Sequence, residues 1–403
     1  MRALSLGQLE GDADAVTGVQ VDSRRVRPGD LFVAVSGGEA FLGDARAHGA
    51  AVTLVPEDAH AALAALGSAV RDRSDARVVA ITGSVGKTST KDILAALLRP
   101  HLRTVAAEDG FNNEIGLPLT ICRIEPETEV VVTEMAMRAP GQIRDLARIA
   151  RPHIGVITSI APVHLERLGS LENIARAKAE LLEELPTGAV AILPDGVPEL
   201  EPFVPEGLDV RRFAQPDAEI RDGQTRVRWH GRDVVFDFAA RHQAANAAAA
   251  LTTAEALGIE SPQEPVEVVF SRWRSQETEL PGGGLLLNDA WNANPVAMRA
   301  ALSHLVERAD GRRTVAILGD MAELGSDAPR YHREIGKDAA GIDVVLGVGE
   351  FARGYEPDEW AATAAEAVDV ALGVVRPGDA ILVKGSRSVG LEVVAEALTE
   401  PRA

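Results

Sequence analysis

A glycine-rich segment near residue 85 constrains this chain more than any other feature. It follows Val78–Thr82 (VVAIT), a short β-branched run that predicts a buried parallel strand, and it precedes a helical pattern from Lys87 to about Leu98. The segment reads Gly-Ser-Val-Gly-Lys-Thr, and its glycines would let backbone N–H groups approach phosphate oxygens at the positive end of the helix. Strand, loop and helix together predict a phosphate loop, although Ile81 fills the first glycine position of the longer consensus.

The residue types in and after this loop indicate its chemistry. Lys87 would reach the terminal phosphates of a nucleotide, and the Thr88 hydroxyl would bind Mg²⁺. Glu134 ends the next strand-like run, EVVVTE, where a carboxylate faces the ligand crevice of a parallel sheet and can bind the metal. Two alternatives remain open: the loop is a Gly-Lys turn that binds no ligand, and Glu134 is an acidic residue at the end of a strand that faces solvent. The predicted nucleotide-contacting residues of the loop are Gly83, Ser84, Val85, Gly86, Lys87, Thr88 and Ser89.

Strand and helix patterns alternate along most of the chain. In the middle block, strand-like runs at 129–134 and 154–160 alternate with helical patterns at 143–149 and 171–185. The last block has strand-like runs between helical stretches such as 296–306, namely 285–288, 314–318, 344–348 and 380–383. The first block is strand-like over 19–35 and 51–55, with a short helix at 59–66. Such alternation predicts parallel sheets with helices on both faces.

Two joints divide the chain into three predicted domains. The charged stretch Arg71–Arg77 is typical of a linker, and Pro262–Pro265 marks a second joint, after a β-rich insertion at 211–238 and an Ala-rich helix at 244–257. One core rarely exceeds about 250–300 residues, so 403 residues fit two or three domains. We therefore expect an α/β protein with a small N-terminal domain (1–76), a central phosphate-loop domain built on a parallel sheet (77–270) and a Rossmann-like C-terminal domain (271–403).

The net charge and the cysteine content argue against several classes of ligand and site. The 41 Lys and Arg against 60 Asp and Glu give a formal charge of −19, which disfavours nucleic-acid polymers but not a small nucleotide. The single cysteine, Cys122, rules out an intramolecular disulfide and a Cys-based zinc site. Because neither a cationic leader nor a long apolar stretch is visible, we expect a cytoplasmic protein in a reducing compartment, without membrane insertion.

The loop TGSVGKTST resembles that of the Mur ligase family, ATP-dependent enzymes that join an amino acid or peptide to a carboxylate. Other segments follow in the family's order. Asn112–Pro118 (NNEIGLP) is similar to the family's asparagine segment, and His242…Asn246 resembles its adenine segment. His164 and Lys178 stand fourteen residues apart in the pattern H-x-E-x-x-G-S…A-K-x-E. The resemblance extends over residues 22 to 390 and implies the three-domain α/β fold of these ligases.

Two further segments indicate which member of the family the chain resembles. Asn288–Pro295 (NDAWNANP) and Leu318–Gly325 (LGDMAELG) resemble those of the ligase that adds D-alanyl-D-alanine to UDP-N-acetylmuramoyl-tripeptide. The D-N-P-R segment expected of the preceding ligase is absent from the sequence. The resemblance implies a monomeric, cytoplasmic ligase of peptidoglycan precursor synthesis, which serves cell shape and cell division. Its small-molecule partners would be the UDP-linked tripeptide, D-alanyl-D-alanine and ATP with two Mg²⁺ ions.

The resemblance also implies roles for individual residues. The catalytic residues would be Lys87, Lys178, His164 and Arg274, and the metal-binding residues would be Thr88, Glu134, His164 and Lys178. Lys178 would carry a carbamate formed from CO₂, which requires a neutral amine and hence a lowered pKa. The remaining nucleotide contacts would be Asn113, Asn246, Arg274 and Asp289. The other substrates would meet Ser23, Arg24, Asn292, Asn294, Lys384, Ser386 and Arg387.

Structural explanations compete with each of these roles. A lone histidine or a helix lysine is often structural, Asn and Asp often cap helices or form turns, and Arg272 competes with Arg274. The chain also departs from the family pattern, because the D-G-H segment is missing where Gly38–Ala50 looks shortened, and substitutions stand at Ser89, Ala136, Ala240, Gln243 and Trp291. Three alternatives therefore remain open: another Mur-type ligase, a phosphate-loop switch that only hydrolyses nucleotide, and a non-catalytic paralogue.

Overall fold

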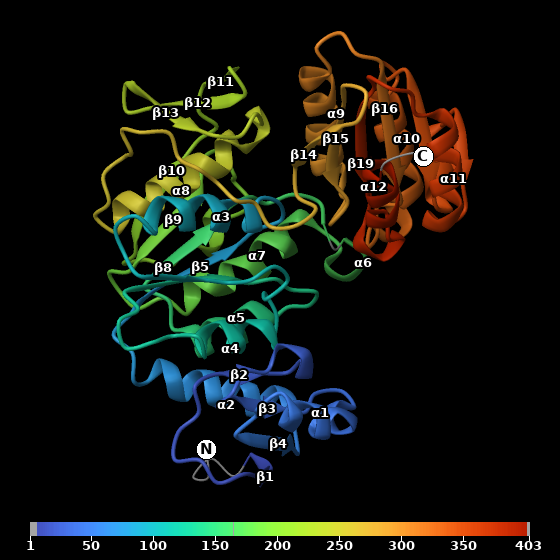
Figure 1. Cartoon of the computed structure of the whole chain (residues 1–403). Coiled ribbons are helices and arrows are strands. Elements are labelled where there is room, and N and C mark those ends of the chain that lie inside the picture. The colour runs from blue at the N-terminus through green and yellow to red at the C-terminus, as the bar shows by residue number, and fades with distance from the viewer. Residues whose placement is uncertain (1–5, 164, 401–403) are drawn as a thin grey trace.

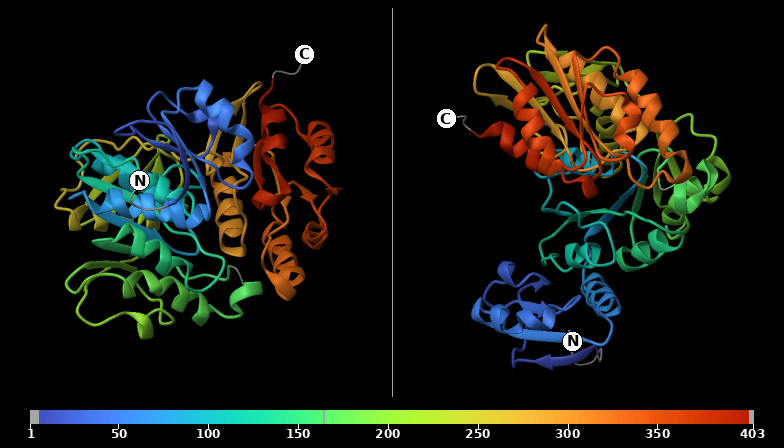
Figure 2. Two further views of the ribbon diagram at one scale, coloured as in Figure 1. Left: turned by 90° about the horizontal axis from the view of Figure 1, so that it is seen from below. Right: turned by 90° about the vertical axis from the view of Figure 1, so that its right-hand side faces the viewer.

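The computed structural model describes residues 6–163 and 165–400, which form three α/β parts in chain order (Figure 1). The N-terminal and C-terminal parts lie at opposite ends of the central part, as two perpendicular views show (Figures 1 and 2). Within the described residues, no helix combines the length and the apolar character needed to cross a membrane.

The N-terminal part is a four-stranded sheet with strand order β1-β4-β3-β2, parallel except for β1. Its elements are β1 (Gly7–Glu10), β2 (Val19–Gln20), β3 (Leu31–Val33), β4 (Val52–Pro56), α1 (Leu42–Ala47) and α2 (Ala59–Arg71). The predicted strand-like run over 19–35 is wrong as a single element. The Asp22 side chain accepts a hydrogen bond from the backbone N–H of Arg24 and begins a 3-10 turn at Ser23–Arg25, so the run splits into two short strands.

The predicted linker at 71–77 is ordered. Arg71 is the last residue of α2, so this helix is longer than the predicted 59–66, and Arg77 begins the first central strand. The Arg71 side chain is buried and donates to the carbonyl oxygens of Ser74 (2.7 Å) and Ala150 (3.0 Å). The charged side chain at the start of this stretch thus satisfies backbone carbonyls at the end of a helix, and residues 72–76 connect that helix to the first central strand.

The central part is built on a six-stranded parallel sheet with order β10-β9-β8-β5-β7-β6. Its strands are β5 (Arg77–Thr82), β6 (Thr104–Ala106), β7 (Val130–Glu134), β8 (Ile154–Ile157), β9 (Val190–Pro194) and β10 (Asp209–Phe213). Its helices are α3 (Lys87–Leu98), α4 (Gly116–Ile121), α5 (Gln142–Ala150), α6 (Leu165–Leu168), α7 (Leu171–Glu183) and α8 (Ala244–Ala256). On β5, Val79 and Ile81 join the core with α3 and α8, whereas Val78 and Ala80 join the core with α4, α5 and α7. Both faces of the sheet are therefore covered, as the apolar strands predicted.

The predicted β-rich insertion at 211–238 divides between two sheets. Strand β10 pairs with β9 at the edge of the central sheet. The rest forms a separate antiparallel sheet of β11 (Ala218–Arg221), β12 (Gln224–Trp229) and β13 (Arg232–Phe236). Val227, Val234 and Phe236 of this small sheet pack into the same core as α8.

The C-terminal part is a second doubly wound sheet with order β14-β15-β19-β16-β17-β18, parallel except for β14. Its strands are β14 (Gln276–Leu280), β15 (Gly284–Asp289), β16 (Thr314–Gly319), β17 (Val344–Val348), β18 (Glu359–Ala361) and β19 (Ala380–Lys384). Its helices are α9 (Pro295–Ala309), α10 (Ala328–Asp338), α11 (Ala364–Val374) and α12 (Glu392–Thr399). Ala316 and Leu318 face the core with α9 and α10, and Val315 and Ile317 face the core with α11 and α12. The predicted α/β fold with parallel sheets is confirmed.

Candidate active site

The predicted phosphate loop, Gly83–Thr88, joins β5 to α3 at the carboxyl edge of the central sheet (Figure 1). Gly83 and Gly86 have positive φ values of +147° and +88°. A Cβ would lie 1.9 Å from Thr158 Oγ1 at Gly83 and 2.1 Å from Asn246 Oδ1 at Gly86. Only glycine fits at either position, because backbone angle and space both exclude a side chain. The loop is therefore held close to the segments that follow β8 and begin α8.

Glu134 lies beside this loop because β7 pairs with β5, which places Glu134 opposite Ile81. The buried carboxylate accepts hydrogen bonds from Thr88 Oγ1 and Asn112 Nδ2, both at 2.7 Å. The hydroxyl and the carboxylate predicted as metal ligands are thus in direct contact. Asn112 belongs to the asparagine segment of the sequence but was not singled out there; its position one residue before Asn113 was the available signal.

Opposite charges meet at the start of α3. Lys87 Nζ donates to the carbonyl oxygen of Gly83 at 2.8 Å. Burial lowers the pKa of Lys87, against the effect of Glu134 and together with that of Arg274. Burial alone would raise the pKa of Glu134, but the charges of Arg274 and Lys87 and its two hydrogen bonds outweigh this and hold it below its ordinary value. The phosphate loop therefore lies beside an ionised carboxylate, Glu134, and two cationic side chains, Lys87 and Arg274. The carboxylate suits a metal ion, and the cations suit a phosphate group.

Lys178 lies on α7 with only 2% of its surface exposed. Within the described part of the chain, its ammonium has no hydrogen-bond or ion-pair partner. Burial, and then the positive charge of Lys87, hold its pKa well below the ordinary value, as the predicted carbamate chemistry requires. The predicted partner His164 lies outside the described residues. Among the residues that are described, no group of three His, Cys, Asp or Glu side chains is arranged to hold a metal.

Arg274 extends from a strained turn just before β14. Its neighbours Trp273 and Ser275 have φ values of +56° and +48°, a left-handed conformation that costs about 1 kcal/mol or more for a residue other than glycine. The guanidinium lies 5.3 Å from the centre of the Trp291 ring, and Arg274 Nε is buried without a hydrogen-bond partner among the described residues. The competing candidate Arg272 is exposed.

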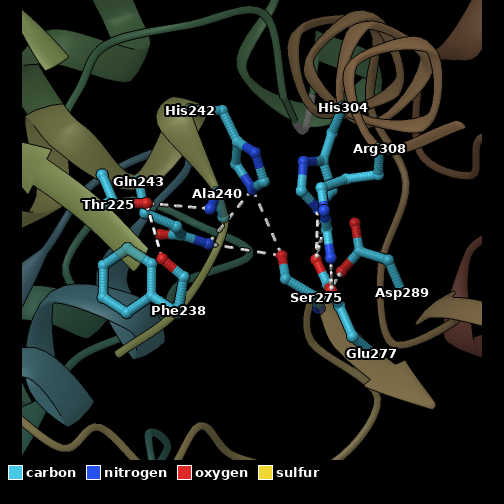
Figure 3. Close-up of polar contacts among 10 residues, drawn as sticks. All are labelled: Thr225, Phe238, Ala240, His242, Gln243, Ser275, Glu277, Asp289, His304 and Arg308. Carbon is cyan, nitrogen blue, oxygen red and sulfur yellow. Dashed lines mark hydrogen bonds and ion pairs between the residues drawn. The ribbon is translucent and has the colours of Figure 1, made fainter. Parts of the chain in front are cut away.

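The predicted adenine segment covers a 3-10 turn, Arg241–Gln243, and the start of α8. Asn246 Nδ2 donates to Gln243 Oε1 at 2.6 Å, and Thr90 of α3 donates to Asn246 Oδ1 at 3.4 Å. His242 and Gln243 face the C-terminal part, where their side-chain nitrogens lie 3.2 and 3.3 Å from Ser275 Oγ (Figure 3). The segment therefore contacts both the phosphate-loop helix and the turn that carries Arg274.

Four predicted ligand residues bind backbone N–H groups here. Asn113, Asn292, Asn294 and Ser386 each accept such a hydrogen bond, at 2.8 to 2.9 Å. Asn113 and Asn294 do so at the starts of α4 and α9. For the three asparagines these are the turn and capping roles that the sequence left open for Asn and Asp, whereas Ser386 accepts the N–H of Ala322, 64 residues away in the sequence. Contact of all four residues with a ligand stays a prediction.

The other predicted residues of the C-terminal part lie together near the ends of β15 and β19. Asp289 and Lys384 end these neighbouring strands and form an ion pair at 2.5 Å. Arg387 forms an ion pair with Glu392, and its guanidinium lies 4.8 Å from the centre of the Trp273 ring. Lys384 and Arg387 are thus both engaged by side chains of the protein itself.

Ser23 and Arg24, the predicted UDP-contacting residues, lie in the N-terminal part. Ser23 is buried, whereas the Arg24 side chain is 83% exposed and forms an ion pair with Asp22 at 2.7 Å. The next residue, Arg25, reaches the central part and forms an ion pair with Glu108 at 2.6 Å. The structure therefore does not bring Ser23 and Arg24 into contact with the phosphate-loop residues, but it links their turn to the loop that follows β6.

Two contacts near the phosphate loop were not predicted. Lys91, one helical turn after Lys87, is buried and forms an ion pair with Asp92 at 2.7 Å. Asp92 also accepts a hydrogen bond from the backbone N–H of Ser271 at 2.9 Å, where the chain enters the C-terminal part. The spacing of four residues between the two lysines was a usable signal for a shared helix face. The contact of Asp92 with Ser271 joins distant positions and had no sequence signal.

Comparison with known families identifies the class of protein. Residues 81–254 match the Mur ligase middle domain, and residues 271–387 match the domain described as Mur ligase, glutamate ligase domain. The two matches follow one another in the order of the central and C-terminal parts. The chain belongs to the Mur ligase family.

Curated relatives and solved structures indicate which members of the family this chain is similar to. The UDP-N-acetylmuramoyl-tripeptide--D-alanyl-D-alanine ligase of Mycobacterium tuberculosis is 34% identical, over 95% of this chain and 92% of that protein. The ligase of the same name from Escherichia coli is 33% identical, over 98% and 96%. The crystal structure of MurF from Acinetobacter baumannii is similar with a TM-score of 0.84 at 26% identity, over 98% and 96% of the two chains. MurF from Thermotoga maritima, in complex with ADP, gives 0.81 at 26% identity, over 95% and 97%.

Proposed function

We propose that this chain is an ATP-dependent, ADP-forming amide ligase that joins D-alanyl-D-alanine to the terminal carboxylate of UDP-N-acetylmuramoyl-tripeptide. The observation that carries the proposal is the contact between Thr88 and Glu134 at a glycine-restricted phosphate loop, with the charges of Lys87 and Arg274 beside it. The chain covers 92% and 96% of the lengths of two curated ligases of this name. This likeness supports UDP-N-acetylmuramoyl-tripeptide and D-alanyl-D-alanine as the substrates over those of another Mur-type ligase. The enzyme acts as a cytoplasmic monomer in peptidoglycan precursor synthesis, and so serves cell shape and cell division.

The donor groups beside the loop fit Mg²⁺. Glu134 is held ionised, and the Thr88 hydroxyl 2.7 Å away is a second oxygen donor, which is the ligand chemistry that Mg²⁺ prefers. We assign one ion to Thr88 and Glu134, and a second to His164 and Lys178. Bound Mg²⁺ would neutralise phosphate charge and polarise the phosphoryl group that is transferred.

Lys178 can serve a metal ion only after chemical conversion, because an ammonium repels a cation. Its burial and lowered pKa favour the neutral amine. The amine nitrogen adds to CO₂ and releases one proton, which leaves a carbamate with a negative charge and two oxygen donors. Labelled bicarbonate followed by carbon NMR should show one slow-exchanging carbamate signal in the wild type and none in Lys178→Ala. A wild-type spectrum without this signal would contradict the assignment.

The ligation divides into two balanced steps. A carboxylate oxygen of the tripeptide attacks the γ-phosphorus of ATP and ADP leaves, which gives an acyl phosphate. The neutral amine of the dipeptide then attacks the acyl carbon, phosphate leaves, and the nitrogen loses a proton as the amide forms. Lys87 and Arg274 offset the negative charge on the transferred group, and the backbone of Gly83–Thr88 orients it.

The remaining predicted contacts distribute the substrates over three domains, 1–76, 77–270 and 271–403. Asn113 and Asn246 would meet the adenine edge and Asp289 the ribose hydroxyls. Ser23 and Arg24 would contact the UDP group. The dipeptide would meet the C-terminal group of Asn292, Asn294, Ser386 and Arg387. Because the substrates are spread over three domains, we expect closure of the domains to keep water away from the acyl phosphate.

Phosphate release measured with and without each substrate tests this function. We expect release from ATP only when both UDP-N-acetylmuramoyl-tripeptide and D-alanyl-D-alanine are present. Release that ignores both substrates would identify a nucleotide switch, and release with a different amino acid in place of the dipeptide would identify another Mur-type ligase. No release under any condition would indicate a non-catalytic paralogue.

A further inference from the structure

The turn that carries Arg274 needs an external restraint. The two non-glycine residues that flank Arg274, Trp273 and Ser275, are in the left-handed region, which is unfavourable unless other groups hold them there. The restraint on Trp273 is visible, since its backbone N–H donates to Gln276 Oε1 at 2.9 Å and its carbonyl accepts from Trp291 N at 3.2 Å. The position of the guanidinium therefore depends on what holds the Ser275 side of the turn.

Asp289 holds the Ser275 side. Its Oδ1 accepts the backbone N–H of Ser275 at 3.2 Å, and its Oδ2 accepts Lys384 Nζ at 2.5 Å. Lys384 is 2% exposed and donates a second hydrogen bond to the carbonyl oxygen of Asn292 at 2.9 Å. The parallel pairing of β15 with β19 sets Asp289 and Lys384 opposite each other. The two strands thus fix the carboxylate, and the carboxylate fixes the turn.

The central part contacts the same turn from the other side. His242 and Gln243 both reach Ser275 Oγ, as Figure 3 shows together with Asp289 on the opposite side. Ser275 is therefore the residue at which the adenine segment of the central part and the strand ends of the C-terminal part meet. A shift of Asp289 would move both the Arg274 turn and this contact between the parts.

We propose that Lys384 is a positioning residue, which sets Arg274 through Asp289 and Ser275 rather than binding the incoming dipeptide. The inference rests on the proposed function, because it concerns the arginine of that reaction. The buried ammonium already donates to Asp289 and Asn292, and it is 2% exposed, so it is poorly placed to bind an arriving carboxylate. The ammonium instead orients the Asp289 carboxylate toward the Ser275 backbone.

A positioning role and a dipeptide-binding role of Lys384 predict effects on different kinetic constants. Lys384→Met separates them, because methionine preserves the length of the side chain and removes its charge. As a positioning residue, its loss should lower kcat about tenfold to a hundredfold and change the KM for D-alanyl-D-alanine by less than about twofold. A rise of about tenfold or more in that KM with kcat unchanged would overturn the proposal. Lys337→Met, at an exposed lysine on α10, is the matched control and should behave as the wild type.

A second readout follows the turn without catalysis. Trp273 and Trp291 stack at 5.9 Å beside Arg274, and the chain has four tryptophans, so replacing Trp229 and Trp360 by phenylalanine leaves only this pair. In that background, Lys384→Met should shift the emission of the free enzyme, while Lys337→Met should not. Unchanged emission in Lys384→Met would overturn the proposal.

The proposal can also be tested if Lys384→Met alone fails to fold. Lys384→Met leaves the Asp289 carboxylate without its ion-pair partner, whereas Lys384→Met combined with Asp289→Asn removes both charges. If only the double variant folds, a shifted emission supports the proposal and wild-type emission overturns it. Wild-type enzyme that releases no phosphate with both substrates would refute the proposed ligase instead, and the emission readout would still decide whether Lys384 holds the turn.

Discussion

His242 should make the folded protein sensitive to acid well above the pH at which carboxylates titrate. Its ring packs edge-on against His304, with centres 4.9 Å apart, and its Nδ1 is buried without a hydrogen-bond partner among the described residues (Figure 3). Burial is the main cause that lowers the pKa of His242 to about 3, from an ordinary value of 6.5. His304 and Lys384 add to the shift, whereas Asp289 and Glu277 oppose it.

The size of the effect follows from this shift. Below about pH 6.5 the unfolded chain binds a proton at His242, whereas the folded protein does not bind it until about pH 3. The free energy of unfolding therefore falls with pH through this window, by about 1.36 kcal/mol for each unit below 6.5. The loss is negligible above about pH 7.5 and reaches about 2 kcal/mol at pH 5, which is about one and a half units lower.

A comparison of the wild type with His242→Gln isolates this contribution. Burial also lowers the pKa values of His153 and His332, so the wild type alone reports a sum. We expect guanidinium unfolding, followed at several pH values from about 7.5 to 5, to show the wild type losing about 2 kcal/mol more than the variant. Glu277, whose pKa is about 2, changes the two proteins alike. Parallel stability curves for the two proteins would refute the reasoning.

Three further predictions concern the phosphate loop. Gly86→Ala sets a Cβ 2.1 Å from Asn246 Oδ1 and should weaken ATP binding about tenfold or more in calorimetric titration, whereas Gly141→Ala, with a φ of +89° and nothing within 4 Å of its Cβ, should bind ATP as the wild type does. Equal affinities would contradict the close approach. Lys87→Ala should abolish ATP-dependent phosphate release, and retained turnover would exclude the phosphate-loop assignment. Glu134→Gln should lower kcat about a hundredfold and blunt its dependence on Mg²⁺ concentration; wild-type kinetics would exclude it as a metal ligand.

The parts of the fold that could be predicted are those whose signal is local. The apolar run at 78–82 and the helix at 87–98 lie where the sequence predicts them, because a strand buried on both faces leaves a continuous apolar run, and the glycine-rich turn after it marks where the helix begins. The run predicted as one strand at 19–35 failed because the Asp22 side chain bonds to the backbone and starts a turn inside it. The end of α2 failed because the apolar stem of Arg71 can be buried while its head bonds to carbonyl groups.

The same distinction applies to the candidate site. The loop residues and Glu134 could be placed because a strand end and a glycine pattern determine where they lie. What each side chain contacts could not be predicted, because the partner comes from another element. Lys384 is the clearest case: its motif suggested a ligand, whereas the register of β15 against β19 gives it Asp289. Only the pairing of the two strands, which no local pattern specifies, determines that contact.

One loop, between β6 and α4, shows why local signals do not reveal how the three parts are joined. Glu108 forms its ion pair with Arg25 of the N-terminal part, and Arg25 also lies 5.7 Å from the centre of the Phe111 ring. Two residues after Glu108, a Cβ added to Gly110 would lie 3.7 Å from the Trp291 ring of the C-terminal part. The same loop leads into the asparagine segment that bonds to the carboxylate beside the phosphate loop. A net charge of −19 gives no hint of this, because the acids that matter here are each matched by a specific cation from a distant part of the chain.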